Sequence, residues 1–381
     1  MTATRILIVA NTAWYLANFR LVLCRALLAR GFEVIAVAPP GDDARRLEDA
    51  GVTFVPLAMD SGGVNPVKDV ILCARFFGVL LRHKPAVCLS YTAKPNIYAG
   101  LVCRVARVPR IHNISGLGSA FIKKTWLTSV VQRLYRAALR GASCVFFQNP
   151  DDRALFLNNG LARAEQVDVL PGSGVDVTRF RPSDQVVHQL LTRPIRFLLS
   201  ARMIWEKGVQ EFVNASQTLR AAGLNVECWL LGPAGVHNPS AIARTTLDAW
   251  SARGTVRYLG AVQDVVPVLS EVDCVVLPSY REGVPRALLE ASSMGLPVIT
   301  TDAVGCREAV DNGITGMVCR VRDSSDLARC MHRMVLMTPA ERQAMGRHGR
   351  EKMVREFDEE IVIDRYLRAI DDALSLKPRG G

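Results

Sequence analysis

The 381-residue sequence lacks the motifs that mark several common nucleotide-dependent enzymes. It contains no G-x-x-x-x-G-K-[ST] phosphate loop, and its glycine loop of note, GLGSAF at 116–121, lacks the third glycine of a dinucleotide fingerprint. It also contains no D-x-D triplet, the commonest acidic clamp for a metal on a diphosphate. These absences remove the main support for an ATPase or an oxidoreductase, and they predict a site that works without a metal or other cofactor.

The sequence also lacks paired cysteines and a membrane-spanning run. Its ten cysteines form no C-x-x-C pair, and most lie in apolar stretches where a free thiol packs as a small hydrophobe, which indicates a reducing cytoplasm. The most apolar run, VILCARFFGVLL at 70–81, is too short for a membrane span and carries Arg75 at its centre. The beginning, MTATRILIVANT, predicts no secretion signal. We therefore expect a cytoplasmic protein whose membrane contact is peripheral.

Positive charge is concentrated in the first half of the chain. Residues 1–180 hold 22 Lys and Arg against 12 Asp and Glu, whereas residues 181–381 hold 25 against 24. From Lys68 to Arg140 there are 13 basic residues and a single acidic one, Asp69. A merely soluble basic surface usually mixes both signs, so one face of the first half is predicted to dock phosphates, anionic lipid or nucleic acid.

The pattern of apolar residues predicts an α/β fold with two Rossmann-like lobes. The length and the 49% hydrophobic content favour two domains. Short β-branched runs alternate with helical periodicity in both halves, which indicates parallel sheets covered on both faces. The expected helices span 20–30, 68–83, 95–106 and 125–140 in the first half, and 208–222, 240–253, 264–271, a segment from Pro285, 324–337, 339–356 and 359–376 in the second.

A break in this pattern predicts the domain boundary. Gly, Pro, Ser and Asp cluster in LPGSGVDVTRFRPSDQ at 170–185, where apolar periodicity lapses. The expected division is an N-terminal domain at 1–172, a linker at 173–190 and a C-terminal domain at 191–358, with a cleft between the two lobes. The final segment, 359–381, contains a helix that can pack back on the N-terminal domain.

Charged residues in the second half follow two predicted strands, where open parallel sheets bind ligands. After CVVLPS comes Glu282 in a loop, and Glu290 lies about one and a half turns along the next helix. Such a pair can form an ordinary capped helix with a solvated salt bridge, or it can accept hydrogen bonds from the vicinal hydroxyls of a hexose and a ribose. The amides at 283–286, which include Gly283 and Val284, would then face an anion. After LLSA, Arg202 and Lys207 provide two cations for a diphosphate.

These motifs resemble a known family. R-x4-K-G, LPSYREGVPRALLEASSMGLPVITTDAVGCREAV and DNGITGMV, in this order and spacing, are similar to the retaining GT-B glycosyltransferases of family 4. KPNIYAG, NISGLGSAF, QNPDD and LPGSGVD in the first half resemble the branch that acts in capsular polysaccharide and lipid-linked oligosaccharide assembly, on undecaprenyl-diphosphate acceptors. The resemblance implies a UDP-sugar donor and transfer with retention, in which the leaving phosphate helps to deprotonate the acceptor.

The resemblance also implies roles for particular residues. Glu282 would contact the donor-sugar hydroxyls and Glu290 the ribose, while Arg202 and Lys207 would hold the diphosphate and stabilise its departure. Gly283 and Val284 would lie at the same nucleotide.

The first half departs from the family pattern at two places. Many relatives have a His-Gly pair where this chain has Ser115-Gly116, so His112, three residues earlier, is a candidate for the catalytic histidine or an ordinary structural one. The loop after the first strand, NTAWYLANFR, has no glycine, although its Arg20 can contact the donor. Acceptor contacts are expected at Ser115 and Gly116, and also at two residues just past a strand end, Lys94 and Asn96.

A predicted basic amphipathic helix indicates where a membrane-linked acceptor would bind. In KKTWLTSVVQRLYRAALR at 123–140, apolar residues recur at helical spacing while Arg133, Arg136 and Arg140 share another face. The helix suits an anionic bilayer surface, or it packs on the core with a solvated basic side. With the helix over 68–83 it can cradle a polyprenyl diphosphate. The expected partners are therefore a nucleotide-sugar donor, a lipid-linked sugar acceptor and an anionic membrane surface at the inner face of the cell membrane.

Two other functions remain open at this stage. A UDP-sugar 2-epimerase of the same two-lobed architecture would turn over its substrate without an acceptor. A non-catalytic membrane-binding or nucleic-acid-binding module would use the basic first half alone. No nucleic-acid-binding motif accompanies that charge, and the near-neutral second half would then have no role, so no nucleic-acid partner is expected.

Overall fold

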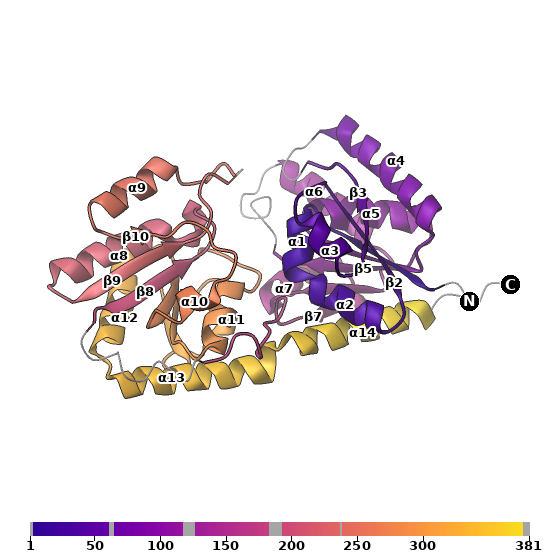
Figure 1. Cartoon of the computed structure of the whole chain (residues 1–381). Coiled ribbons are helices and arrows are strands. Elements are labelled where there is room, and N and C mark those ends of the chain that lie inside the picture. Colours follow the sequence, from indigo (N-terminus) through magenta and orange to yellow (C-terminus); the bar gives the residue numbers. More distant parts are fainter. Residues whose placement is uncertain (1–2, 61–64, 117–125, 183–192, 237, 376–381) are drawn as a thin grey trace. The chain divides into compact units, whose positions relative to one another are not determined.

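The computed structural model describes residues 3–60, 65–116, 126–182, 193–236 and 238–375, except for the side chains of residues 126 and 127. The chain forms two compact units (Figure 1). Unit 1 comprises residues 1–173 together with 362–381, and unit 2 comprises residues 174–361. The last helix of the chain thus begins in unit 2 and continues into unit 1.

Unit 1 contains a seven-stranded parallel sheet in the order β3-β2-β1-β4-β5-β6-β7. The central strands are entirely or almost entirely buried, because helices cover both faces and leave no side of the sheet for polar residues. The strands are β1 (Arg5–Val9), β2 (Glu33–Ala38), β3 (Thr53–Pro56), β4 (Val87–Tyr91), β5 (Arg110–Ile114), β6 (Cys144–Phe147) and β7 (Val167–Val169).

The helices of unit 1 form two layers. One core lies under α1, α2 and α14, and two further cores lie under α4, α5, α6 and α7. The α-helices are α1 (Ala13–Phe19), α2 (Leu21–Ala29), α3 (Ala44–Glu48), α4 (Pro66–His83), α5 (Ala93–Val105), α6 (Trp126–Leu139), α7 (Pro150–Asn158) and α14 (Glu359–Ser375).

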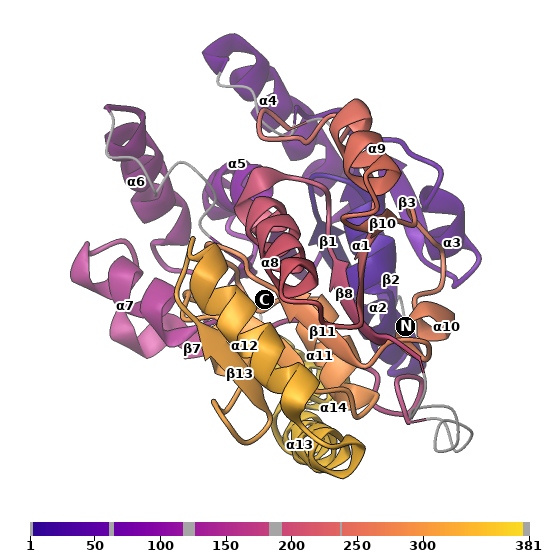
Figure 2. The same cartoon turned by 90° about the vertical axis from the view of Figure 1, so that its left-hand side faces the viewer.

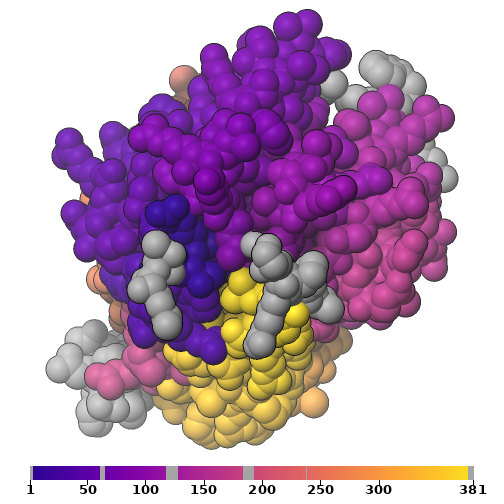
Figure 3. Space-filling view, turned by 90° about the vertical axis from the view of Figure 1, so that its right-hand side faces the viewer, coloured from indigo at the N-terminus to yellow at the C-terminus, as the bar shows by residue number. Residues whose placement is uncertain are grey.

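Helix α14 completes the core of unit 1. Its Tyr366, Ile370 and Ala373 are buried in the cluster that also holds Leu16 and Leu27 of the first two helices. Arg30 at the end of α2 pairs with Asp371 at 3.2 Å. Figure 3 shows the yellow carboxyl-terminal segment beside the indigo amino-terminal segment on one face. Residues almost at opposite ends of the chain therefore share one core.

Unit 2 repeats the architecture with a six-stranded parallel sheet in the order β10-β9-β8-β11-β12-β13. Helices α8 and α12 pack side by side on one face (Figure 2), and α11 lies on the other face. The strands are β8 (Ile195–Ser200), β9 (Val226–Leu231), β10 (Arg257–Tyr258), β11 (Cys274–Leu277), β12 (Val298–Thr301) and β13 (Gly316–Cys319). The α-helices that lie wholly in unit 2 are α8 (Val209–Ala221), α9 (Arg244–Ala252), α10 (Val266–Leu269), α11 (Arg286–Ser293), α12 (Ser324–Leu336) and α13 (Pro339–Lys352).

The expected α/β class and the paired parallel sheets are confirmed, but the segment after the first strand differs from the prediction. It forms helix α1, whose first turn is capped because Tyr15 N donates to Thr12 Oγ1 at 3.1 Å. The predicted helix over 20–30 corresponds to α2, and α1 is an additional helix that ends where α2 begins, at Arg20. Helices α3 and α7 were not predicted from the sequence either. In the part of the chain that the structure describes, no helix has the length and apolar character to cross a membrane.

Candidate functional site

In unit 2, β9 and β10 lie on one side of β8, and β11, β12 and β13 lie on the other side. The order of the strands therefore switches between β8 and β11, which are parallel neighbours. In open α/β sheets, ligands bind at such a switch point, outside the carboxyl ends of the strands. The loop after β8 carries Arg202 and Lys207, and the loop after β11 carries Glu282. Three of the predicted donor residues therefore come from the two loops that flank one switch point.

Lys207 and Glu282 are in direct contact. The Lys207 ammonium pairs with Glu282 Oε1, and Ser279 Oγ donates to the same oxygen at 2.7 Å. The two side chains are only 17% and 14% exposed. Among the described residues the other carboxylate oxygen, Glu282 Oε2, has no hydrogen-bond partner. The ion pair thus fixes the carboxylate and leaves one acceptor oxygen for a ligand.

A glycine allows the two loops to approach this closely. Gly208 has φ +71°, and a Cβ atom there would lie 2.0 Å from Pro278 O. Tyr280 N also donates to Glu206 O at 2.9 Å, which ties the loop after β11 to the loop after β8. The glycine of the K-G pair therefore has a physical reason: only glycine lets the turn that carries Lys207 pack against the loop after β11, the neighbouring strand in the sheet.

A second glycine sets the other side of the Glu282 loop. Gly305 has φ +84°, and a Cβ atom there would lie 2.2 Å from Gly283 O. Glu282 N donates to Val304 O at 2.9 Å. The loop that carries Glu282 and Gly283 is thus held from both sides by backbone contacts.

Glu290 lies on α11 and is 15% exposed. Its Oε1 pairs with Arg286 Nε at 2.7 Å, so one oxygen of this carboxylate takes part in a largely buried salt bridge. Burial raises the pKa of Glu290 above its ordinary value, and Arg286 opposes this effect. The helix has no side-chain cap and no acidic residue in its first turn, so its positive end is not neutralised locally.

Arg202 is exposed, and no ion pair or hydrogen bond to its guanidinium occurs among the described residues. It stands at the carboxyl end of β8 and is available to an anion. The described residues contain no group of three His, Cys, Asp or Glu side chains that could hold a metal ion. The groups at this switch point suit a diphosphate and sugar hydroxyls, which Arg, Lys and carboxylate side chains bind directly.

In unit 1 the switch point lies between β1 and β4, and a strained residue marks it. Thr92, directly after β4, has φ +66° and ψ 162°, a conformation that costs a β-branched residue free energy. Strain of this kind clusters at functional sites. Nothing in the sequence pattern singled out Thr92, because φ cannot be read from residue type.

The predicted acceptor residue Lys94 follows Thr92 but is not a free cation. Its ammonium pairs with Asp69 of α4 at 3.1 Å, and the two side chains are 14% and 9% exposed. Tyr98 Oη donates to the other oxygen of Asp69 at 2.7 Å. The single acidic residue of the basic region therefore anchors α4 to α5.

Asn96 and His112 lie in the core, and this argues against their predicted roles. Each is 1% exposed. Ser90 Oγ donates to Asn96 Oδ1 at 2.7 Å and lies 2.8 Å from His112 Nδ1, and Asn96 Nδ2 donates to Asn113 O at 2.8 Å. Burial, and then Arg110, lowers the pKa of His112 to about 3. A buried neutral imidazole has no access to a sugar, so His112 is a structural residue here.

Arg20 is also buried instead of facing a ligand. It is 1% exposed, and its guanidinium lies 4.4 Å from the ring centre of Tyr91, with Tyr15 and Tyr366 at 5.5 and 5.9 Å. It donates to Tyr15 Oη at 3.0 Å and to Ser173 Oγ at 3.2 Å. The aromatic rings and hydroxyls replace the carboxylate that a buried arginine normally requires.

Ser115 and Gly116 follow the carboxyl end of β5, with Ser115 half-buried and Gly116 exposed. Both stand at the edge where acceptor contacts were predicted. The remainder of the glycine loop, residues 117–121, and the start of the basic segment, 123–125, lie outside the described residues, as do 183–190 of the predicted linker.

Comparison with known families identifies the two units. Residues 194–336 match the family model "Glycosyl transferases group 1", and residues 17–172 match "Glycosyl transferase 4-like domain". The chain belongs to the family 4 glycosyltransferases. The resemblance noted from the motifs is thus confirmed, and the activity class, transfer of a glycosyl group, follows from it.

Two relatives of this glycosyltransferase match over most of their length. The N,N'-diacetylbacillosaminyl-diphospho-undecaprenol alpha-1,3-N-acetylgalactosaminyltransferase of Campylobacter jejuni is 27% identical over 93% of this chain and 95% of its own. The UDP-Gal:alpha-D-GlcNAc-diphosphoundecaprenol alpha-1,3-galactosyltransferase of Escherichia coli is 22% identical over 80% of this chain and 79% of its own.

Solved structures agree on the fold of this glycosyltransferase. HepE of Anabaena, solved in complex with UDP and glucose, has a TM-score of 0.80 at 17% identity and covers 97% of this chain and 99% of its own. A glycosyltransferase of Rickettsia africae has a TM-score of 0.79 at 16% identity, over 99% and 100%. The predicted GT-B fold is therefore confirmed.

Proposed function

We propose that this glycosyltransferase transfers a hexose or N-acetylhexosamine, with retention and without a metal, from a UDP-sugar to a polyprenyl-diphosphate-linked sugar in surface polysaccharide or glycan assembly. The observation that carries the donor half of this proposal is the Lys207–Glu282 pair at the switch point of unit 2. It presents a fixed carboxylate oxygen beside an ammonium group, a combination suited to a sugar that is attached to a diphosphate.

The sugar, the diphosphate and the ribose of a UDP-sugar each have a candidate partner in unit 2. Glu282 Oε2 would accept from a hydroxyl of the transferred sugar. Arg202 would contact the diphosphate and stabilise the charge that develops as the nucleotide leaves, with the uncapped amino end of α11 contributing its positive dipole. Glu290, already buried and paired with Arg286, would accept from the ribose hydroxyls.

The acceptor half rests on the relatives and on the position of unit 1's loops. Both relatives described above are named for sugars linked through a diphosphate to undecaprenol, and the Escherichia coli enzyme is named for a UDP-linked donor. In unit 1, Thr92, Ser115 and Gly116 follow strand ends of the sheet and would line the acceptor sugar.

Helix α4 supports a peripheral membrane partner. Val67, Val70 and Leu81 are 69%, 68% and 60% exposed, and Ile71 and Phe77 are also exposed, so an apolar stripe at helical spacing faces outward along the helix. Basic residues such as Lys68, Arg75 and Arg82 accompany the stripe. An amphipathic helix of this composition would lie in the interface of an anionic bilayer.

A donor panel with a matched pair of variants tests the proposal. Purified protein is incubated with UDP-hexoses and UDP-N-acetylhexosamines and a truncated prenyl-diphosphate sugar, with and without EDTA, and UDP release and product mass are measured. Glu282→Gln should lower kcat/KM roughly a hundredfold or more, because it removes a charged acceptor from the reacting sugar. Glu351→Gln, an exposed change on α13, is the control.

Different results would overturn different parts of the proposal. Absence of transfer with every donor and acceptor would refute the function, and an unchanged rate in Glu282→Gln would refute the assigned site. Conversion of the UDP-sugar without an acceptor would instead indicate an epimerase. Loss of activity in EDTA, or a product of inverted anomeric configuration by NMR, would refute the metal-independent or retaining course.

A further inference from the structure

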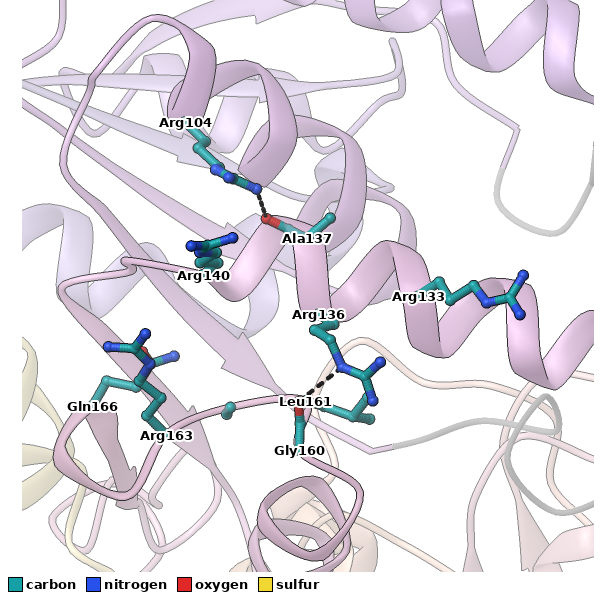
Figure 4. Close-up of a pocket in the computed structure, with 10 residues that line it drawn as sticks. Arg104, Arg133, Arg136, Ala137, Arg140, Gly160, Leu161, Arg163 and Gln166 are labelled. Carbon is teal, nitrogen blue, oxygen red and sulfur yellow. Dashed lines mark hydrogen bonds between the residues drawn. The ribbon is translucent and has the colours of Figure 1, made fainter.

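Unit 1 contains an arginine pocket that includes none of the residues assigned above to the donor or the acceptor sugar. Five arginines line it, together with Gln166, around a cavity of about 450 Å³ (Figure 4). None of the described residues that line this cavity is an Asp or a Glu. We call it the arginine pocket, and its arginines are Arg104, Arg133, Arg136, Arg140 and Arg163.

Two of these arginines are held in place by backbone oxygens. Arg136 donates to Gly160 O at 3.0 Å and to Asn159 O at 2.8 Å, and Arg104 donates to Ala137 O at 2.9 Å. Such bonds satisfy carbonyl groups at the ends of α7 and α6, an ordinary structural use of arginine. They orient the guanidinium groups but leave their full positive charge in the pocket.

The other three arginines have no such explanation. Arg133 and Arg140 are exposed, and among the described residues their guanidinium groups have no partner. Within the described part of the chain, the charged partner of Arg163 is Glu165 at 3.7 Å, and both side chains are 70% exposed, where an ion pair contributes little. Like charges around one cavity repel one another, so an anion would relieve a cost that the protein carries without it, although the Arg133 side chain is directed away from the other arginines (Figure 4).

The arginine pocket lies away from the switch point of unit 1. Helix α5 ends before β5 begins, α6 before β6 and α7 before β7, and the pocket is formed by the ends of these helices and the segment after α7. It therefore stands at the edge where the strands start, whereas the switch point lies at their carboxyl ends. A ligand here is not the transferred sugar.

We propose that the arginine pocket is a second anion site, which binds a phosphate monoester or a diphosphate. Guanidinium groups bind phosphate oxygens through paired N–H donors, and several of them from different segments can surround one group. The cavity is large enough for a diphosphate. The phosphate can belong to a soluble compound or to the headgroup of a lipid, and the experiment below separates the two.

The first arm uses inorganic diphosphate and calorimetry on the full chain, with every protein carrying Arg202→Gln to weaken the donor site, because UDP would itself compete for a diphosphate pocket. The protein with an intact arginine pocket should bind diphosphate, and Arg140→Gln/Arg163→Gln should bind it roughly tenfold more weakly or worse, because it loses two charge-assisted contacts. The control is Arg347→Gln/Arg368→Gln, which removes the same charge from exposed helix positions outside the pocket and should bind like the protein without these changes.

The second arm measures flotation with phosphatidylglycerol vesicles, and with phosphatidylcholine vesicles as reference. Weaker binding of the pocket variant than of the control variant to anionic vesicles assigns the phosphate to a lipid headgroup. Loss of diphosphate binding with unchanged vesicle binding assigns it to a soluble compound. Equal behaviour of the two variants in both arms overturns the proposal. None of these readouts depends on glycosyl transfer, so a failure here is distinct from a failure of the proposed function.

Discussion

Replacing His112 with glutamine should remove most of the acid sensitivity of strand β5. The Ser90 hydroxyl has one hydrogen, which it donates to Asn96 Oδ1, so His112 Nδ1 must carry a hydrogen to donate to Ser90 Oγ. His112 Nε2 is then bare, and it is buried without a partner. Protonation at Nε2 would place a charge and an unsatisfied N–H in the core of unit 1.

The magnitude follows from the two pKa values. Folding lowers the pKa of His112 from 6.5 to about 3, so the folded state binds fewer protons and stability falls as the pH drops below 6.5. From pH 6.5 to pH 4.5 this linkage lowers the free energy of opening by about 2 kcal/mol, which is roughly a thirtyfold larger opening constant. The loss continues down to about pH 3, where the folded imidazole itself becomes protonated.

Amide hydrogen exchange of peptides that cover residues 110–114 measures this quantity within unit 1. Comparing proteins at the same pH cancels the intrinsic pH dependence of exchange. In wild type and in the exposed control His348→Gln, the free energy of opening should fall by the full amount between pH 6.5 and pH 4.5. In His112→Gln it should fall only a little. If His112→Gln loses as much as wild type, the imidazole is not the group that titrates, and its assignment as a buried neutral residue is wrong.

Three further predictions concern the loops and the donor carboxylate. Gly208→Ala should weaken UDP binding in calorimetry and lower the melting temperature of unit 2 far more than Gly254→Ala, because both have positive φ but only the first forces a Cβ atom to 2.0 Å from a backbone oxygen, at Pro278. Glu290→Gln should bind UDP and 2'-deoxy-UDP equally, whereas wild type should prefer UDP by roughly tenfold; equal binding by wild type would contradict the ribose contact. Thr92→Gly should raise the stability of unit 1 to urea by about 1 kcal/mol through relief of strain while it lowers kcat/KM, and an unchanged rate would separate the strain from function.

The sheets and the donor loops could be predicted from the sequence because their signals are local. Buried parallel strands appear as continuous apolar runs. The R-x4-K-G and E-x7-E motifs place Lys207 and Glu282 in loops that follow predicted strands, and Glu290 on the helix after the second loop, without knowledge of the fold. The sheet order then brings the first two into contact. The ion pair of Glu290 with Arg286 follows from i, i+4 spacing on a helix.

The residues of unit 1 could not be assigned in this way because their surroundings come from distant segments. Arg20 is enclosed in part by Tyr366, and Asn113 donates to the hydroxyl of that same tyrosine at 2.6 Å, although hundreds of residues separate them. His112 follows a strand pattern that reads equally as a core or an edge position. Helix α1 was missed because it is short and its only signal is the capping Thr12.

Because helix α14 completes the core of unit 1, the order of synthesis affects when that unit can fold. Unit 1 needs Tyr366, Ile370 and Ala373 in its core, but the ribosome makes all of residues 174–361 before it reaches them. One face of the amino-terminal sheet, which α1 and α2 cover only in part, must therefore wait for α14 while unit 2 is made, and this is a period in which a chaperone would protect it. For the same reason, a fragment ending at residue 172 would expose that face, whereas one with residues 362–375 joined to it would not.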